Sequence, residues 1–297
     1  MIEAIILAGT SDREKRLIQG KNKFFVKIKD RYIGNTVIEA LSETSVIDAI
    51  YVIGNKSELK KAVLDAKVRR IIQERGGYYA NALEAFTHTQ NSDSVEKQVL
   101  YSACDIPFLT ARAVEDFISR APDADFILPY CLREDFEALF PGYRWPYLVF
   151  KEGEVKFGNI ALVKPNRIAN RMLFDQFFGL RKVAVSDRRK EEMLNVPRVL
   201  MKALTLKGLE GLEIVTREVY LKYIAKPLGL GIATARYLPL GRIADVFSAI
   251  LGCEVKGVRT RYPEICYDID NERKDLKYAV ENYEVIRKRI DSRQFII

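Results

Sequence analysis

Histidine is almost missing from this 297-residue sequence, in which His88 is the single example. Mechanisms that pair a histidine with a catalytic serine or cysteine therefore find little support. The four cysteines, Cys104, Cys131, Cys253 and Cys266, are scattered and form no C-x-x-C pair. We expect neither a structural zinc site nor a disulfide framework. His88 lies in a polar stretch, THTQNSDS, where we expect it to be solvated.

Long hydrophobic runs are absent too. No stretch approaches the ~20 apolar residues that a membrane-spanning helix needs. The opening residues, MIEAIILAG, lack the basic start and long apolar core of a secretory signal, so we expect a cytoplasmic protein. The net charge of +8 fits either a generally basic surface or an anionic partner. Because the basic residues are not interleaved with stacking aromatics, no nucleic-acid partner is expected.

Short apolar segments alternate with amphipathic ones over the first 130 residues. We predict strands at 4–8, 49–53, 70–73, 97–103 and 124–130. The helices predicted between them cover 36–43, 57–67 (capped by Ser57), 79–86 and 111–121 (capped by Thr110). This alternation suits right-handed crossovers and predicts an α/β fold with a doubly wound, mostly parallel sheet. Ligands of such sheets bind across the carboxyl ends of the strands.

The pattern changes after residue 130. Residues 131–146 are predicted as loop, and 147–163 as an antiparallel hairpin that makes the sheet mixed. A mostly helical insertion is expected at about 166–252, within a single domain that spans 1–297. The chain then returns to the core at 254–297, as a strand at 254–259, a strand or extended segment at 264–269 and a helix at 272–290. The apolar part of the insertion, 198–230, fits core packing, a homo-oligomer interface or a peripheral membrane contact equally well.

A polar loop follows the first strand. Gly9 ends the apolar run AIILA, and the residues from Thr10 to Lys23 carry hydroxyl and basic side chains. A buried strand that opens into such a loop is typical of phosphate binding in α/β proteins. On the local pattern alone, an ordinary turn with solvated charges is an equally good interpretation.

Three carboxylates are candidates for metal binding. Asp105 directly follows the apolar strand VLYSAC, and Asp268 and Asp270 lie two residues apart in CYDIDNERKDL. Mg²⁺ is commonly held by one or two carboxylates together with phosphate oxygens. The alternative is local, because Asp105 fits a turn or helix cap and Asp270 or Asn271 fits a cap of the last helix. We expect one of the two late aspartates to face a metal and the other to cap the helix.

At this point the sequence resembles the MobA-like nucleotidyltransferases. The family opens with L-A-G-G-x-S-x-R-M-G-x-x-K, and here Leu7 to Ser11 are followed by a longer charged stretch, then Arg16, Gly20 and Lys23. CDIPFLT is similar to the family's acidic strand end, and DIDNERKDL to its closing D-[IV]-[DGN]-T-P-E-D-L motif. The resemblance covers residues 1–130 and, more loosely, 254–280. It implies a GT-A-type, Rossmann-like fold.

The resemblance also implies a reaction, the transfer of a nucleoside monophosphate from an NTP to a phosphorylated small molecule or cofactor, with release of pyrophosphate. It implies Mg²⁺ as cofactor, with Asp105, Asp268 and Asp270 as its ligands. Catalytic roles fall on Lys23, Arg16 and Asp105. Nucleotide binding falls on Leu7, Ala8, Gly9, Thr10, Ser11, Lys23 and, in the loop after the third strand, Asn81. By their placement alone, Asn159, after Gly158 in the predicted hairpin, and Lys164, at the end of IALVKP, are candidates for binding the acceptor, and stabilising the hairpin is an equally good interpretation of both.

The opening loop departs from the family pattern in two places. Thr10 stands where the family has a second glycine, and Leu17-Ile18 replaces Met-Gly, with Gly20 displaced. Two other functions therefore stay open. A GT-A glycosyltransferase would use a nucleotide sugar, although a D-x-D pair is missing at Asp105. A nucleotide-binding scaffold would bind without turnover.

Overall fold

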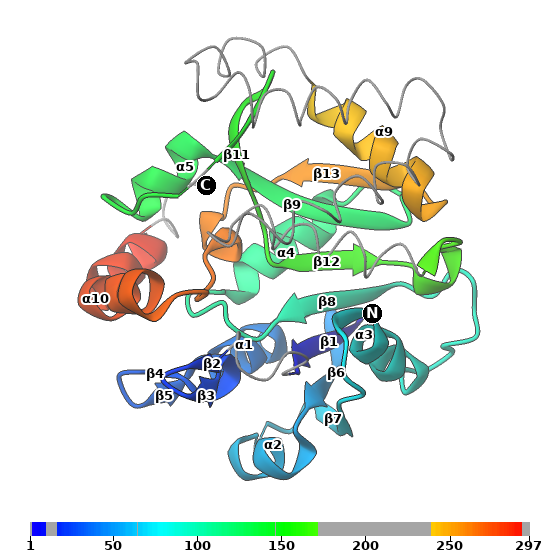
Figure 1. Cartoon of the computed structure of the whole chain (residues 1–297), viewed down its shortest axis with the longest axis horizontal. Helices are drawn as coiled ribbons and strands as arrows, with labels where there is room; N and C mark the ends of the chain where they lie inside the picture. The colour runs from blue at the N-terminus through cyan, green and yellow to red at the C-terminus, as the bar shows by residue number, and fades with distance from the viewer. Residues whose placement is uncertain (1, 10–16, 64, 146, 172–238, 293–297) are drawn as a thin grey trace, which may run out of the picture.

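The computed structural model describes residues 2–9, 17–63, 65–145, 147–171 and 239–292. Most of the predicted helical insertion, including 198–230, lies outside these ranges. The main element is a nine-stranded sheet of order β10-β11-β9-β12-β8-β1-β6-β7, with β13 paired to β9 (Figure 1). The strands are β1 (Ile2–Ala8), β6 (Ile47–Gly54), β7 (Val68–Gln73), β8 (Val99–Ala103), β9 (Phe126–Leu132), β10 (Leu148–Phe150), β11 (Gly153–Phe157), β12 (Ile160–Val163) and β13 (Val255–Arg259). β11 and β12 run against the other strands, so the sheet is mixed but mostly parallel, as predicted.

Helices cover both faces of this sheet. They are α1 (Ile33–Ser42), α2 (Lys56–Ala62), α3 (Tyr78–Thr87), α4 (Ala111–Arg120), α5 (Arg133–Leu139), α9 (Leu240–Leu251) and α10 (Lys277–Ser292). Because the residues of β1 from Ala4 to Ala8 are all apolar and buried, alternate side chains pack into opposite layers. Ile6 packs in one cluster with α1, α2 and α4, and Ile5 packs in another with α3 and α9. The doubly wound α/β fold is confirmed.

Two small hairpins and several single turns complete the described elements. The hairpins pair β2 (Leu17–Ile18) with β3 (Lys21–Asn22) and β4 (Lys27–Ile28) with β5 (Arg31–Tyr32). Short 3-10 turns cover Lys23–Phe25, Pro165–Arg167 and Pro263–Cys266, and a π turn at Glu272–Leu276 precedes α10. Gln19 and Gly20 form the first hairpin turn with φ of 54° and 70°. The displaced glycine of the opening loop is therefore a turn residue.

The structure corrects four local predictions. Helix α2 is capped by Asn55, whose side chain accepts from the Ser57 N–H, and not by Ser57 itself. Part of the predicted loop 131–146 is helix α5, which buries Phe136 and Leu139. The predicted hairpin 147–163 is three strands, because β12 turns away to pair with β8 and β9. The start of 264–269 is a 3-10 turn rather than a strand.

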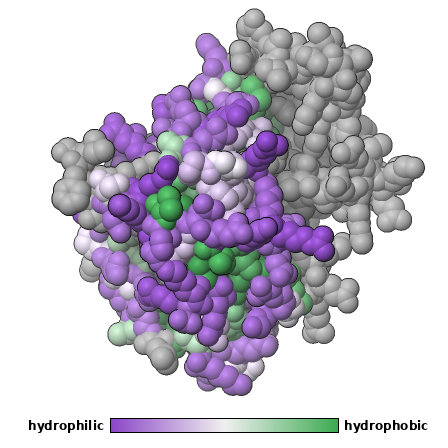
Figure 2. All heavy atoms as spheres, turned by 90° about the vertical axis from the view of Figure 1, so that its left-hand side faces the viewer, coloured by the Kyte–Doolittle hydropathy of each residue, from purple (hydrophilic) through white to green (hydrophobic). Residues whose placement is uncertain are grey.

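A third hydrophobic cluster, rich in aromatic residues, covers the edge of the sheet at the carboxyl ends of the parallel strands. Phe108, Phe136, Phe140 and Tyr267 pack there with the buried side of α10. In Figure 1 this end lies on the left, beside α5 and α10. Figure 2 turns the same side to the viewer and shows hydrophilic side chains around a smaller hydrophobic area. Among the described residues, no helix is both long and apolar enough to cross a membrane.

Candidate active site

The site forms where two parallel strands and a late loop meet. β1 and β8 are neighbours in parallel register, with Leu7 opposite Ala103, so their carboxyl ends lie side by side. Asp105 follows β8 by two residues. Its backbone carbonyl accepts from the Ile269 N–H at 3.1 Å, which ties the late loop to this edge of the sheet. Residues far apart in sequence are thereby brought together.

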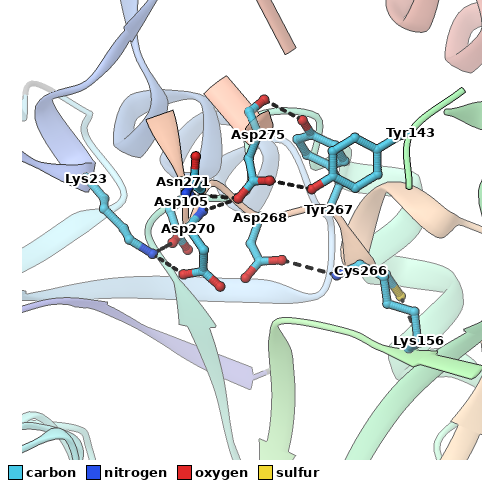
Figure 3. A network of polar contacts seen from close by, with 10 residues as sticks. All are labelled: Lys23, Asp105, Tyr143, Lys156, Cys266, Tyr267, Asp268, Asp270, Asn271 and Asp275. Atoms are coloured by element: carbon cyan, nitrogen blue, oxygen red, sulfur yellow. Dashed lines mark hydrogen bonds and ion pairs between the residues drawn. The ribbon is translucent and has the colours of Figure 1, made fainter. Parts of the chain in front are cut away.

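Three carboxylates converge in this place. Asp105, Asp268 and Asp270 each offer an oxygen, and these oxygens all lie within 4.8 Å of one another (Figure 3). Asp105 and Asp268 are buried, whereas Asp270 is exposed. An acidic group of this kind, with two members removed from water, is strongly disfavoured without cations.

Lys23 supplies one of those cations. The Asn22 side chain accepts from the Phe24 N–H and donates to the Ala8 carbonyl at 2.7 Å, which fixes the chain beside the end of β1. The Lys23 Nζ atom then lies 2.7 Å from Asp105 Oδ2 and 2.5 Å from Asp270 Oδ1. Burial opposes the charge on this amine, but the two carboxylates outweigh it and raise the pKa of Lys23. Its side chain is therefore a fixed ammonium.

Asp268 has a cation of its own. The Nζ atom of Lys156, on β11, lies 3.2 Å from Asp268 Oδ1, and both side chains are buried. Burial raises the pKa of Asp268 to about 6, with Lys156 opposing the rise and the neighbouring Asp270 and Asp105 adding to it. The face of Trp145 covers Lys156, with its ring centroid 3.4 Å from Nζ.

A buried carboxylate outside the cluster shapes the loop. Asp275 accepts from the N–H groups of Asp270 and Asn271 at 2.9 and 2.7 Å, both on Oδ2. The Tyr143 hydroxyl donates to Oδ1 at 2.6 Å. The Tyr267 hydroxyl donates to the Asp275 backbone carbonyl at 2.6 Å. These bonds hold the segment that carries the two late aspartates (Figure 3).

The expected sharing of roles between the late aspartates is wrong. Asn271 caps the turn before α10, because its side chain accepts from the Lys274 N–H. Asp268 and Asp270 both belong to the carboxylate cluster. The cap and the cluster are thus made by different residues of the same loop.

The cluster fits a divalent metal. It offers only oxygen donors, which suit hard cations such as Mg²⁺ or Mn²⁺. One face is open at Asp270, where the side chain is 54% exposed, so oxygens of a bound phosphate could complete the shell. Asp105, Asp268 and Asp270 would hold such an ion.

The predicted nucleotide-binding residues lie beside this cluster where the structure describes them. Leu7, Ala8 and Gly9 form the end of β1 and the start of its loop. A Cβ added to Gly9 would come within 2.3 Å of the Asn81 amide, so any larger residue here would have to displace the Asn81 side chain. The Asn81 amide also accepts from the Arg75 N–H at 2.7 Å and donates to the Gly76 carbonyl. The predicted residues Thr10, Ser11 and Arg16 lie outside the described part of the chain.

The two predicted acceptor-binding residues, Asn159 and Lys164, lie at opposite edges of the sheet. Asn159 precedes β12 at the site edge, where its backbone carbonyl accepts from the Ala103 N–H and its N–H donates to the Ile265 carbonyl. Lys164 follows β12 at the opposite edge, because β12 runs antiparallel to β8. There it pairs with Asp123 at 2.9 Å and Glu96 at 3.3 Å. The structure therefore places Asn159 at the edge of the sheet that carries the cluster, and Lys164 at the other edge.

Sequence reasoning missed Lys156, Asp275 and Asn22. Lys156 stands in an alternating segment, EVKF, where a lysine is expected to face water. Asp275 looks like an ordinary acidic residue in the first turn of a helix. Asn22 directly precedes Lys23 in the candidate phosphate loop. That position was the one feature of the sequence that could have identified Asn22 as a site residue.

His88 is not simply solvated, as the sequence suggested. It ends α3, with Nδ1 3.0 Å from an Arg70 nitrogen and Nε2 3.4 Å from Glu84. It follows the carboxyl end of α3, whereas Asn81, which lies against Gly9, is near the amino end of the same helix. Neither of its two partners belongs to the carboxylate cluster.

The sequence matches the family profile of the MobA-like NTP transferase domain over residues 4–159. Among solved structures, a hypothetical transferase from Thermus thermophilus is 24% identical, with a TM-score of 0.60, and the match covers 92% of this chain and 99% of that one. This likeness supports the fold. No curated protein matches the sequence.

Two further structures align over 96% of this chain at 12% identity and a TM-score of 0.49. One is 4-diphosphocytidyl-2C-methyl-D-erythritol synthase from Anaerococcus prevotii, of which the match covers 96%. The other is a nucleotidyl transferase from Methanothermobacter, of which it covers 99%.

Proposed function

The chain belongs to the MobA-like NTP transferase family and is a nucleotidyltransferase, and on this premise we propose its reaction. A divalent cation, Mg²⁺ in the cell, would support transfer of a nucleoside monophosphate from an NTP to a phosphorylated small molecule. An acceptor oxygen attacks the α-phosphorus, the bond from that phosphorus to the bridging oxygen breaks, and pyrophosphate leaves. No protein nucleophile takes part.

The observation that carries this proposal is the convergence of Lys23 with three carboxylates at the end of β1 and β8. Phosphoryl-type transfers rest on positioning and charge stabilisation rather than on covalent chemistry by the protein. When bound, the metal would supply Lewis-acid stabilisation of the phosphate charge. Asp105, Asp268 and Asp270 would place it.

Lys23 has the second role. Its ammonium is held within hydrogen-bond reach of Asp105 and Asp270, beside the path proposed for the phosphates along the loop after β1. A fixed cation there stabilises the negative charge that develops when the α-phosphate is attacked. The loop from Gly9, with Thr10, Ser11 and Arg16, would wrap the triphosphate and base, and Asn81 would support it. Asn159 would face the acceptor.

We also propose that residues 1–297 form one such domain, with the segment at about 166–252 inserted into it. The support is the return of the chain to the core after the insertion. β13 pairs with β9 in parallel, and the loop after it delivers Asp268 and Asp270 to the cluster. A family core that ended at residue 159 would lack two of the three carboxylates.

The first test is release of pyrophosphate from each of the four common NTPs, supplied with a panel of phosphorylated acceptors. We expect release with one NTP and acceptor, loss of release on chelation by EDTA, and recovery with added Mg²⁺ or Mn²⁺, because no lysine can replace the metal's two charges. Turnover of a nucleotide sugar instead of an NTP would contradict the proposal. NTP binding in a thermal-shift assay with no turnover of any acceptor would favour a scaffold.

A further inference from the structure

Lys156 is a buried lysine that the proposed reaction does not yet use. It lies on β11 opposite Cys131 of β9, and the whole residue is only 4% exposed. Lysines are almost never buried without a partner, because removing an ammonium from water is strongly unfavourable. The surroundings of this side chain therefore have to explain its position.

Two kinds of contact hold its ammonium. Asp268 Oδ1 lies 3.2 Å away on the side of the carboxylate cluster. On the other side are aromatic faces, with the centroid of Trp145 at 3.4 Å and that of Phe136 at 5.5 Å. A cation over an indole face is stabilised by the ring's electrons. Trp145, the single tryptophan of the sequence, thus makes a cation–π contact that keeps the Lys156 ammonium next to Asp268.

Lys156 and Lys23 approach the three carboxylates from opposite sides (Figure 3). Lys23 pairs with Asp105 and Asp270, and Lys156 pairs with Asp268. Every carboxylate of the cluster therefore has an ammonium partner within 3.2 Å. The two lysines differ in setting, since Lys23 follows the loop expected to hold the triphosphate, whereas Lys156 is enclosed by aromatic rings.

We propose that Lys156 is a positioning residue that fixes the carboxylate of Asp268 in the metal site while weakening the attraction of the site for the cation. This inference rests on the proposed function, because it assigns Asp268 to a metal. The ammonium orients Asp268 through a direct contact. Its charge repels a divalent ion held by the same oxygen cluster. Lys156 itself does not contact the substrates.

The two effects give the substitution Lys156→Met an unusual expected result. Methionine has nearly the volume of the lysine side chain but no charge, so the space against the Trp145 ring stays filled. Because Lys156 would repel a divalent ion in this cluster even under water-like screening, removing its charge should raise Mn²⁺ affinity roughly tenfold. Turnover should fall at the same time, because Asp268 loses the contact that orients it. A purely structural residue would lower both quantities or neither.

Mn²⁺ affinity is measured on the metal-free full-length protein by isothermal titration calorimetry, and turnover by pyrophosphate release. Lys156→Arg retains the charge and should return Mn²⁺ affinity close to that of the wild type. Lys256→Met is the matched control, because Lys256 lies on β13, is about half exposed and pairs only with Glu254 among the described contacts. It should change neither quantity.

The possible outcomes distinguish failure of the role proposed for Lys156 from failure of the proposed metal-dependent reaction. If Asp105→Asn weakens Mn²⁺ binding but folded Lys156→Met binds Mn²⁺ with unchanged or lower affinity, the role of Lys156 is wrong and the metal site stands. If Asp105→Asn leaves Mn²⁺ binding unchanged, the metal site itself is wrong. If Lys156→Met binds Mn²⁺ more tightly and turns over as fast as the wild type, the positioning role is overturned.

Discussion

Asp105→Asn is expected to lower turnover by roughly 10²–10³-fold, the size of effect seen when one group that stabilises transition-state charge is removed. Asp105 stands at the centre of the site. Its carboxylate is one of the three in the cluster and also accepts from Lys23 at 2.7 Å. The amide keeps the size of the side chain but loses its charge, so both the metal and the ammonium lose an anionic partner.

The fold should tolerate this change. Replacing one of three adjacent carboxylates by a neutral amide relieves repulsion between like charges, and the backbone bond from Ile269 to Asp105 does not involve the side chain. The midpoint of thermal unfolding in the absence of metal is therefore expected to change little, because this relief offsets the loss of one anionic partner of Lys23. Asp123→Asn is the matched control, since Asp123 is 94% exposed and pairs with Lys164 at the far edge of the sheet. Full activity of Asp105→Asn would remove the cluster from the mechanism.

The central strands of the sheet could be predicted because each contains a continuous apolar run. β1, β6 and β8 are buried on both faces, so their signal needs only local sequence. The same rule placed Asp105, since a polar residue directly after a buried parallel strand lies at the ligand-binding edge. Lys23 was found in this way as well, through the loop that follows β1.

The remainder of the site depends on contacts between distant segments. Lys156 is buried because α5, the loop that carries Trp145 and the late segment at Asp268 close over β11. The sequence around EVKF gives no local signal that these three segments will pack against Lys156. The position of Lys164 could not be predicted for a related reason, because the predicted hairpin gave β12 no neighbour in the sheet. Only its antiparallel pairing with β8 sends Lys164 to the opposite edge.

The late aspartates show how much a resemblance can add. The residues alone left Asp268 and Asp270 as either metal ligands or helix caps, since both roles favour a short acidic side chain. The resemblance favoured the metal, and the structure places both residues in the cluster. It also identifies Asn271 as the cap. What neither source indicated is the carboxylate that orders this loop, Asp275.

Asp275→Ala is expected to lower the free energy of unfolding by about 3 kcal/mol, since hydrogen bonds to a charged group contribute roughly 1.5–3 kcal/mol each and part of the loss is recovered by water. Asp275 is 2% exposed and accepts from two backbone N–H groups and from Tyr143. Without it, the N–H groups of Asp270 and Asn271 lose their common acceptor, and the loop through Asp270 becomes less ordered. Turnover and Mn²⁺ affinity should therefore fall together, in contrast to Lys156→Met.

The variants Asp275→Asn and Tyr143→Phe distinguish which hydrogen bonds of Asp275 order the loop. In the Asp275→Asn variant, the new amide oxygen can still accept from the N–H groups of Asp270 and Asn271, so this variant should regain most of the Mn²⁺ affinity but less of the stability. Tyr143→Phe removes only the bond to Oδ1 and should destabilise the fold by about 1–2 kcal/mol with little effect on Mn²⁺ binding. Denaturant unfolding and calorimetry measure the two quantities on the same samples. If Asp275→Ala were as stable as the wild type and bound Mn²⁺ equally well, the loop would be ordered by the packing of Tyr267 and α10 rather than by this carboxylate.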